Sequence, residues 1–178
     1  MQGQNKGNLL LYFALFNFTV YNFIMKKIVI SSCLLGACTK YDGGHNKKEQ
    51  ILKKLVNMEI ISLCPEVLGG LPTPRPPAEI IGGDGFSVLK GNCKVLNNLG
   101  EDVTENFIKG AKETLRICLD KGCQIAILKG NSPSCSNKFI YDGSFRGKKV
   151  LGLGVTAALL IENNIKVFSE EDDLSGLF

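Results

Sequence analysis

The chain has 178 residues, 44% of them hydrophobic and 21% charged, which is the composition of one globular domain with its own core. Its net charge of +4 is small and no run of Lys or Arg stands out, so charge gives no argument for a nucleic-acid surface. The seven cysteines are odd in number and irregular in spacing. This pattern argues against a disulfide scaffold and favours thiols that stay reduced, as in cytoplasmic enzymes.

Residues 1–24 contain an apolar and aromatic run that several polar residues interrupt. The run is too short and too polar for a transmembrane helix, and it lacks the basic start and the cleavage site of a secretory signal. Met25 then precedes two lysines and the first clear strand. We expect residues 1–24 to be an extension upstream of the native start and residues 25–178 to form one domain. A membrane-binding or partner-binding tail is the alternative.

Short apolar runs alternate with helical patterns along the rest of the chain. Continuous apolar runs predict buried strands at residues 28–31, 60–63, 125–128 and 165–168. Helices are predicted from a capping box of Asn46 and Glu49 to about Met58, from Asp102 to Gly122, and from Thr156 to about Glu162. This order predicts an α/β fold with a mostly parallel sheet, right-handed crossovers and helices on both faces.

The remaining segments are predicted as loops or small elements. Four prolines and several glycines in residues 67–85 argue against a regular element, and a loop of this length is more often functional than idle. Residues 86–89 and 94–96 are predicted to form a hairpin. Residues 141–154 are predicted as a loop with room for an edge strand, and the polar tail at 170–178 is expected to fray.

Three cysteines follow predicted parallel strands. Cys33 and Cys64 come directly after the first and second strands, and Cys135 lies in the loop after the third. Because the carboxyl ends of parallel strands meet at one sheet edge, where α/β proteins bind ligands, we expect these thiols to converge. Three thiolates can hold a metal ion or an iron–sulfur cluster and leave one position open. The spacing alone does not choose between zinc and iron–sulfur, and three unrelated loop thiols are the alternative.

The other four cysteines have different surroundings. Cys118 lies on the apolar stripe of a predicted helix, Cys123 precedes a strand at the opposite sheet edge, and Cys93 lies in the predicted hairpin, so all three are predicted to be structural. Cys38 shares the first loop with Cys33. Its C-x4-C spacing allows a fourth ligand or a resolving thiol.

Polar side chains near the three cysteines are candidates for catalysis and substrate binding. Glu66 follows Cys64 by two residues, and a carboxylate there can position or deprotonate water. Ser132 and Ser134 precede the third cysteine and can hydrogen-bond a ligand or a cluster sulfur. Arg75 is held between prolines, which suits the anchoring of a carbonyl or an anion. Each of these four side chains is also compatible with an ordinary loop position.

Several long motifs resemble the thiouracil desulfidase (TudS-type) family over about residues 26–170: SSCLLGACTKYDGG, LCPEVLGGLPTPRPPAEI, GEDVTENFIKGA and AILKGNSPSCS, with GVTAALL and VFSE near the end. The resemblance implies a compact three-layer, Rossmann-like α/β fold. It also implies a [4Fe–4S] cluster held by Cys33, Cys64 and Cys135, whose fourth iron has no protein ligand. Members of the family remove sulfur from thiolated uracil, giving uracil and sulfide, and the motifs CPE and SPSC make Glu66 and Ser132 the catalytic pair.

We therefore predict a cytoplasmic, iron–sulfur-dependent and non-redox desulfidase. Its expected substrate is a small thiolated base rather than a nucleic acid, because the chain has no basic stripe, and no membrane is expected if Met25 is the start. Ser136 departs from the family, which usually has Gly after SPSC, and a side chain there would narrow the pocket or shift the loop. The alternatives are a metal-binding or cluster-binding module without turnover, and a thiol redox protein that uses Cys33 and Cys38.

Overall fold

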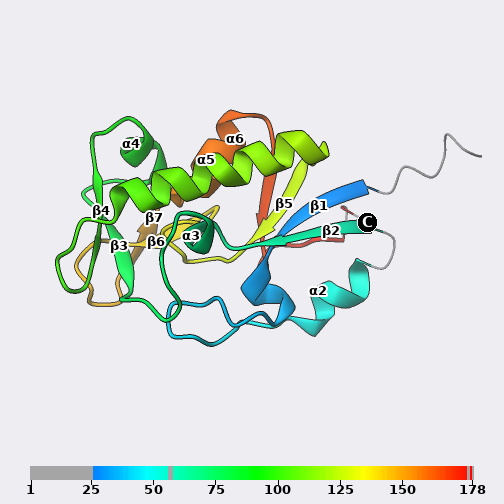
Figure 1. Cartoon of the computed structure of the whole chain (residues 1–178), viewed down its shortest axis with the longest axis horizontal. Coiled ribbons are helices and arrows are strands. Elements are labelled where there is room, and N and C mark those ends of the chain that lie inside the picture. The colour runs from blue at the N-terminus through cyan, green and yellow to red at the C-terminus, as the bar shows by residue number, and fades with distance from the viewer. Residues whose placement is uncertain (1–25, 56–57, 176, 178) are drawn as a thin grey trace, which may run out of the picture.

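The computed structural model describes residues 26–55, 58–175 and 177, so the extension predicted at residues 1–24 lies outside the described residues. A four-stranded sheet forms the centre of the fold (Figure 1). In spatial order its strands are β2 (Met58–Leu63), β1 (Lys26–Ser31), β5 (Ile125–Leu128) and β8 (Lys166–Ser169). All three neighbouring pairs are parallel, which confirms the predicted sheet.

Helices cover both faces of this sheet, because successive residues of each buried strand point to opposite sides. Val29 of β1 packs in one apolar cluster with residues of α5 (Thr104–Lys121) and α6 (Val155–Glu162). Its neighbours Ile28 and Ile30 pack on the other face with α2 (Glu49–Lys54). Figure 1 shows α5 and α6 above the sheet and α2 below it. The predicted three-layer α/β fold is therefore confirmed.

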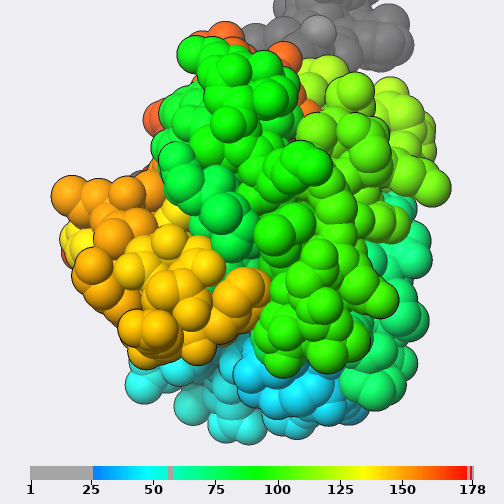
Figure 2. Space-filling view, turned by 90° about the vertical axis from the view of Figure 1, so that its left-hand side faces the viewer, coloured from blue at the N-terminus to red at the C-terminus, as the bar shows by residue number. Residues whose placement is uncertain are grey.

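A second, smaller core lies beyond the carboxyl ends of the parallel strands. It lies between α5, α6 and five small elements: β3 (Ala78–Ile81) paired with β4 (Lys94–Asn97), β6 (Phe139–Tyr141) paired with β7 (Lys149–Leu151), and α4 (Gly85–Leu89). Both pairs are antiparallel. Figure 2 shows this end of the molecule, with the segment around β6 and β7 (yellow and orange) standing beside the green surface of β4 and α5.

Two predicted elements in this region are wrong. The segment 67–85 contains β3, although its prolines and glycines argue against a regular element. The strand predicted at 86–89 is instead α4, because Asp84 Oδ1 accepts a hydrogen bond from the Ser87 backbone N at 3.1 Å and so caps a helix start. The partner of β4 is therefore β3 and not residues 86–89.

The predicted helix boundaries also need correction. The helix α2 begins at Glu49 without a side-chain cap and ends at Lys54, so Asn46 is not its capping residue and Met58 already belongs to β2. The helix α6 begins at Val155, which places Thr156 inside it. Gly122 does end α5 in the left-handed conformation, with φ of 71°, as predicted.

The predicted fraying of the tail is wrong for residues 170–175. Glu170 accepts hydrogen bonds from the Lys129 ammonium and from the Gly130 backbone N, the latter at 2.7 Å. Leu174 is only 4% exposed and packs in the apolar cluster below the sheet. The acidic side chains of this tail thus bind backbone and lysine donors and hold it against the domain. Over the described ranges, no helix is both long and apolar enough to cross a membrane.

Candidate functional site

The order of the parallel strands places the topological switch point of the sheet at the carboxyl end of β1. The chain passes from β1 to β2 on one side and then returns to β5 on the other side of β1, and ligands bind at such reversals. Cys33 lies in the short 3-10 helix η1 (Ser32–Leu35) that follows β1. Cys64 follows β2 and caps α3 (Pro65–Leu68), and Cys135 lies in the turn after β5.

The three thiols are free, and Cys33 and Cys135 are buried whereas Cys64 is partly buried. Cys33 is 8% exposed and Cys135 is 5% exposed. Burial raises the pKa of Cys135, and the charges of Cys64, Glu66 and Cys33 raise it further. Burial also raises the pKa of Cys33, whereas a hydrogen bond from the Asn46 side chain lowers it and the charge of Cys64 raises it. The three thiols therefore lie close enough together for their charges to act on one another.

The chemistry of the three thiols suits an iron–sulfur cluster. Within the described residues, no three His, Cys, Asp or Glu side chains lie close enough together to share one metal ion. In a [4Fe–4S] cluster each thiolate binds a different iron, so its ligands stand farther apart than the ligands of one zinc ion. Three soft, free thiolates are a donor set that fits an iron–sulfur cluster.

A carboxylate, a guanidinium and a hydroxyl lie beside the thiols. Arg75 Nε donates to Glu66 Oε2 at 2.8 Å, and their side chains are only 5% and 15% exposed. Ser132 Oγ donates to the other carboxylate oxygen, Glu66 Oε1, at 3.4 Å. Arg75 is itself fixed, because its guanidinium also donates to the carbonyls of Pro72 at 3.2 Å and of Thr39 at 3.1 Å. The carboxylate of Glu66 thus has both oxygens engaged at a defined position.

The turn that carries Cys135 is tied to the start of α6. Ser132 Oγ accepts hydrogen bonds from the backbone N of Ser134 at 3.1 Å and of Cys135 at 3.2 Å. Ser134 is 1% exposed, and its hydroxyl lies 2.9 Å from Thr156 Oγ1. The Thr156 backbone N also donates to the Ser134 carbonyl at 2.8 Å. These bonds fix the position of the third thiol relative to the sheet.

The comparisons with known proteins agree with this geometry. Residues 28–172 match the family model described as 2-thiouracil desulfurase. The chain belongs to the 2-thiouracil desulfurase family. YbbK of Bacillus subtilis (strain 168), described as an uncharacterized protein, is 48% identical over 145 residues, which are 82% of this chain and 96% of YbbK. A solved structure of a [4Fe-4S]-dependent thiouracil desulfidase, TudS, is 40% identical, with a TM-score of 0.71 over 85% of this chain and 94% of that chain. The predicted family, and with it the prediction of an enzyme, is confirmed.

The structure brings most of the predicted site residues of this desulfurase-family chain to one place. Glu66, Arg75 and Ser132 form one hydrogen-bonded group beside the three cysteines. Ser134 lies in the same turn, but its hydroxyl is directed to Thr156. Ser136 is 1% exposed, and its hydroxyl donates to the Phe139 carbonyl at 2.6 Å.

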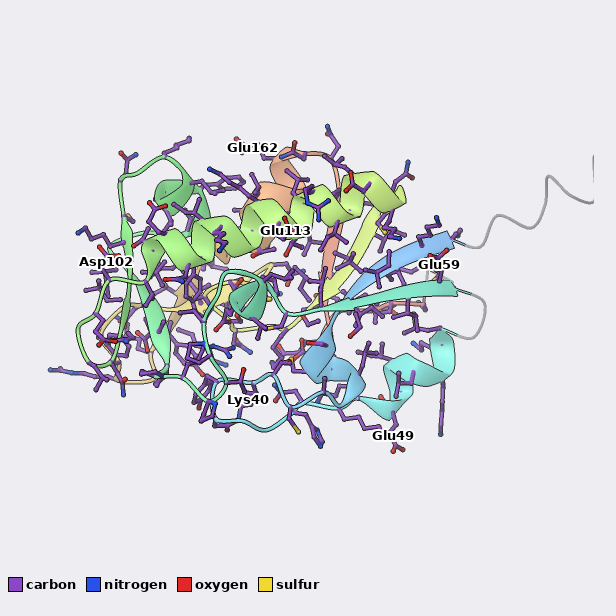
Figure 3. The ribbon with its side chains drawn as sticks, viewed as in Figure 1. Lys40, Glu49, Glu59, Asp102, Glu113 and Glu162 are labelled. Carbon is purple, nitrogen blue, oxygen red and sulfur yellow. The ribbon has the colours of Figure 1, made fainter. Side chains whose placement is uncertain are left out.

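The other cysteines lie apart from this group. Cys118 and Cys123 are buried in the apolar cluster between the sheet and α5, so their predicted structural role is supported. Cys38 is exposed on the loop after η1. Figure 3 shows this loop, marked by Lys40, running beneath α3, whereas Glu49, Glu59 and Glu162 lie at the periphery of the fold.

Sequence reasoning missed several residues that contact the thiols. Ser31 donates a hydrogen bond to Cys135 Sγ at 3.7 Å, and Asn46, instead of capping a helix, lowers the pKa of Cys33 and donates from its backbone N to the Cys33 carbonyl at 2.9 Å. Lys129, directly after β5, lies close enough for its charge to lower the pKa of Cys33. Ser31 is part of the motif around the first cysteine and so had a signal in the sequence, whereas the partners of Asn46 and Lys129 depend on the folded loops.

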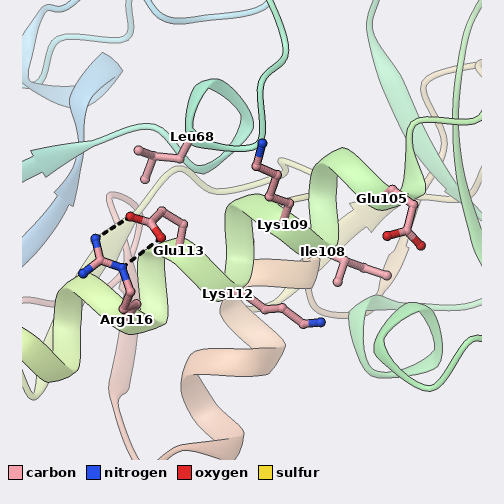
Figure 4. Close-up of a pocket in the computed structure, with 7 residues that line it drawn as sticks. All are labelled: Leu68, Glu105, Ile108, Lys109, Lys112, Glu113 and Arg116. Carbon is pink, nitrogen blue, oxygen red and sulfur yellow. Dashed lines mark hydrogen bonds and ion pairs between the residues drawn. The ribbon is translucent and has the colours of Figure 1, made fainter.

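A surface hollow lies away from this site. It has a volume of about 600 Å³ and lies over α5 (Figure 4), and none of the three cysteines lines it. Its lining includes Lys109, Lys112 and Arg116, and Arg116 is paired with Glu113. A smaller hollow of about 140 Å³ lies against the outer side of the Cys135 turn, where Ser136 lines it. We place the candidate site by the convergence of the thiols and not by these hollows.

Two glycines pack closely against the backbone of site segments and so set the positions of those segments. A Cβ on Gly110 of α5 would lie 2.0 Å from the Pro65 carbonyl oxygen, so only glycine lets α5 pack against the segment of Cys64 and Glu66. A Cβ on Gly154 would lie 2.4 Å from the Ser134 carbonyl carbon and 2.7 Å from the Cys135 backbone N. The site therefore depends on glycines that lie outside the cysteine motifs.

Gly154→Ala is expected to displace the Cys135 turn. The added methyl group meets backbone that cannot yield locally, and overpacking of this kind costs about 1–3 kcal/mol of unfolding free energy. We expect a lower iron content after anaerobic reconstitution, measured per protein. Gly91→Ala is the matched control, because its φ of 76° imposes strain of about 1–3 kcal/mol while no atom lies within 4 Å of the new methyl group. Full iron content in Gly154→Ala would contradict the assignment of Cys135 as a cluster ligand whose turn depends on Gly154.

Proposed function

We propose that this protein converts a small thiolated pyrimidine, of the thiouracil kind, to the corresponding oxo compound and releases the sulfur as sulfide. Its cofactor is a [4Fe–4S] cluster held by Cys33, Cys64 and Cys135, with the fourth iron free of protein ligands. The observation that carries this proposal is the convergence of three free thiols, two of them buried and Cys64 partly buried, beside the Glu66 carboxylate. The description of TudS as a [4Fe-4S]-dependent thiouracil desulfidase supports it.

The overall reaction balances without electron transfer. Water supplies the oxygen that replaces sulfur, and its two protons leave with the sulfur as hydrogen sulfide. When bound, the cluster supplies a Lewis-acidic iron for the soft thiocarbonyl sulfur. The protein must then position a water molecule, take a proton from it and return a proton to the departing sulfur. A cytoplasmic location, where thiols stay reduced, is part of the proposal.

Glu66 is the proposed general base. Its Oε2 is held by Arg75 at 2.8 Å, which leaves Oε1 directed toward Ser132 in the turn that carries Cys135. The carboxylate is 15% exposed, so few water molecules reach it and a bound one is held close to the reacting carbon. Removal of a proton by a positioned carboxylate contributes about 10²–10⁴-fold to a rate.

Ser132 is the proposed proton donor and orienting hydroxyl. Two backbone N–H groups donate to its oxygen, so its single proton is free to point at Glu66 Oε1, 3.4 Å away. This distance is long for a hydrogen bond, and catalytic hydrogen bonds commonly shorten only when substrate is bound. The pair can therefore pass a proton from the attacking water toward the departing sulfur.

The predicted role of Arg75 and Ser134 in substrate binding stays a prediction. Both side chains also have protein partners, since Arg75 binds Glu66 and the Thr39 carbonyl, and Ser134 binds Thr156. We propose that they act mainly through these partners. Arg75 holds the catalytic carboxylate, and Ser134 fixes the turn that carries the third cysteine.

Arg75→Lys is expected to lower turnover by roughly 10–100-fold while the iron content stays unchanged. A lysine keeps the charge, but it lacks the planar group that binds Glu66 and two carbonyls at once. The double variant Arg75→Lys/Glu66→Gln should be no slower than Glu66→Gln alone, because both changes remove the same function. Independent, multiplying effects in this double-mutant cycle would show that Arg75 acts on the substrate directly.

The proposal is tested with the full chain purified and reconstituted without oxygen. Iron and acid-labile sulfide are measured per protein, and 2-thiouracil is then supplied. Formation of uracil and sulfide in equal amounts, without added reductant, is the expected result. A full cluster without sulfide release would favour a binding module. Parallel assays with a thiolated nucleoside and with thiolated tRNA identify the size of the substrate.

A further inference from the structure

Ser31 ends β1 directly before the segment that carries Cys33, and its hydroxyl is bound on two sides. It donates to Cys135 Sγ at 3.7 Å, a length suited to the large sulfur atom, across 104 residues of sequence. Its oxygen accepts a hydrogen bond from the Lys129 backbone N at 3.0 Å. The side chain therefore joins the first and third parallel strands of the site.

The direction of the bond to sulfur follows from the partners of the hydroxyl. A serine has one O–H proton, and the Lys129 amide requires the oxygen to act as an acceptor. The proton is then left to point at the sulfur. Ser31 is 2% exposed, so solvent does not compete for it. A buried hydroxyl that both donates and accepts a hydrogen bond keeps one orientation.

The Lys129 amide is held in place by the C-terminal segment. Glu170 binds both the Lys129 ammonium and the Gly130 backbone N, and its side chain is only 2% exposed. The Lys129 ammonium also donates to the Gly130 carbonyl at 2.8 Å. The backbone at residues 129–130 is therefore fixed from the side opposite Ser31, and the hydrogen bond to Cys135 is pre-organised.

We infer that Ser31 is a positioning residue that tunes the bound cluster through its hydrogen bond to the Cys135 sulfur; the inference rests on the proposed function. A hydrogen bond to a ligand sulfur withdraws electron density from the thiolate, and such bonds are among the factors that set the potential of iron–sulfur clusters. In a reaction without electron transfer the same withdrawal leaves the iron a stronger acceptor for a thiocarbonyl sulfur.

The test compares the reduction potential of the reconstituted cluster in wild-type protein and variants. Ser31→Ala should bind the normal amount of iron and show a lower potential, whereas Ser31→Thr keeps the hydroxyl and should restore the wild-type value. Ser32→Ala is the matched control. Ser32 is 7% exposed and adjacent in sequence, but its hydroxyl lies 2.8 Å from Thr39 Oγ1 and has no bond to sulfur. Its potential should be that of the wild type.

An unchanged potential in Ser31→Ala with a full cluster would overturn the inference and leave the desulfidase proposal intact. A wild-type protein that takes up no cluster would overturn both. If Ser31→Ala does not fold, the wild-type protein still decides the matter through its iron–sulfur vibrations. Reconstitution in D₂O should shift the Fe–S(Cys) resonance Raman bands, and bands at unchanged frequency would overturn the inference.

Discussion

Glu66→Gln is expected to keep the cluster and to lower the rate of desulfuration by about 10²–10⁴-fold, the usual effect of losing an acid–base group. Glutamine has nearly the shape of glutamate and can still accept a hydrogen bond from Ser132. It cannot take a proton from water, and it gives Arg75 no charged partner. Because Glu66 is not one of the three proposed cluster ligands, the iron content should not change. Turnover of 2-thiouracil, normalised to bound iron, measures the effect.

A second carboxylate provides the control for this experiment. Glu101 accepts a hydrogen bond from Asn97 at 2.6 Å in the turn between β4 and α5, so Glu101→Gln also alters a hydrogen-bonded glutamate. We expect it to leave turnover per iron unchanged. Full turnover in Glu66→Gln would remove Glu66 from the mechanism. An equal loss of turnover in both variants would point to a general effect on the fold.

The central sheet could be predicted because its strands are continuous apolar runs, and the two central strands are buried on both sides. Residues 28–31 and 125–128 are largely buried from end to end, and no other local signal competes with them. The small elements beyond the sheet could not be predicted in the same way. The strand β3 lies among prolines and glycines that signal a loop, and its pairing with β4 is determined by packing around Ile80 and Val95. Asp84 also caps a helix, α4, where the sequence predicted a strand.

The candidate site was partly predictable for a topological reason. Parallel strands end at one edge, so cysteines that follow different strands had to approach one another. The contacts that complete the site join distant segments and have no local pattern. Ser31 and Cys135 are 104 residues apart, and Glu170 reaches Gly130 across 40 residues. Asn46 shows the opposite problem, because its capping pattern with Glu49 concealed its hydrogen bond to the Cys33 backbone carbonyl.

Cys135→Ala is expected to abolish cluster binding and with it all desulfuration. Two thiolates hold a [4Fe–4S] cluster poorly, and loss of this ligand leaves an iron uncoordinated in a largely buried site. Iron and labile sulfide should fall close to zero, and the broad visible absorbance of the cluster should disappear. Cys33→Ala and Cys64→Ala should have the same result. A Cys135→Ala protein that keeps its cluster would remove the basis of the proposed function.

Two cysteines outside the proposed ligand set show whether such a loss is specific to the ligands. Cys118 packs in the same apolar cluster as Cys135 and is fully buried, and burial raises its pKa to about 12, so it stays an unreactive thiol. Cys118→Ala should therefore cost about 1 kcal/mol of unfolding free energy and leave the iron content unchanged. Cys38→Ala should keep both iron and turnover, because Cys38 is exposed and is not a ligand in the proposal. Loss of turnover in Cys38→Ala with a full cluster would instead favour the thiol redox alternative, since that reaction needs Cys38 as the partner of Cys33.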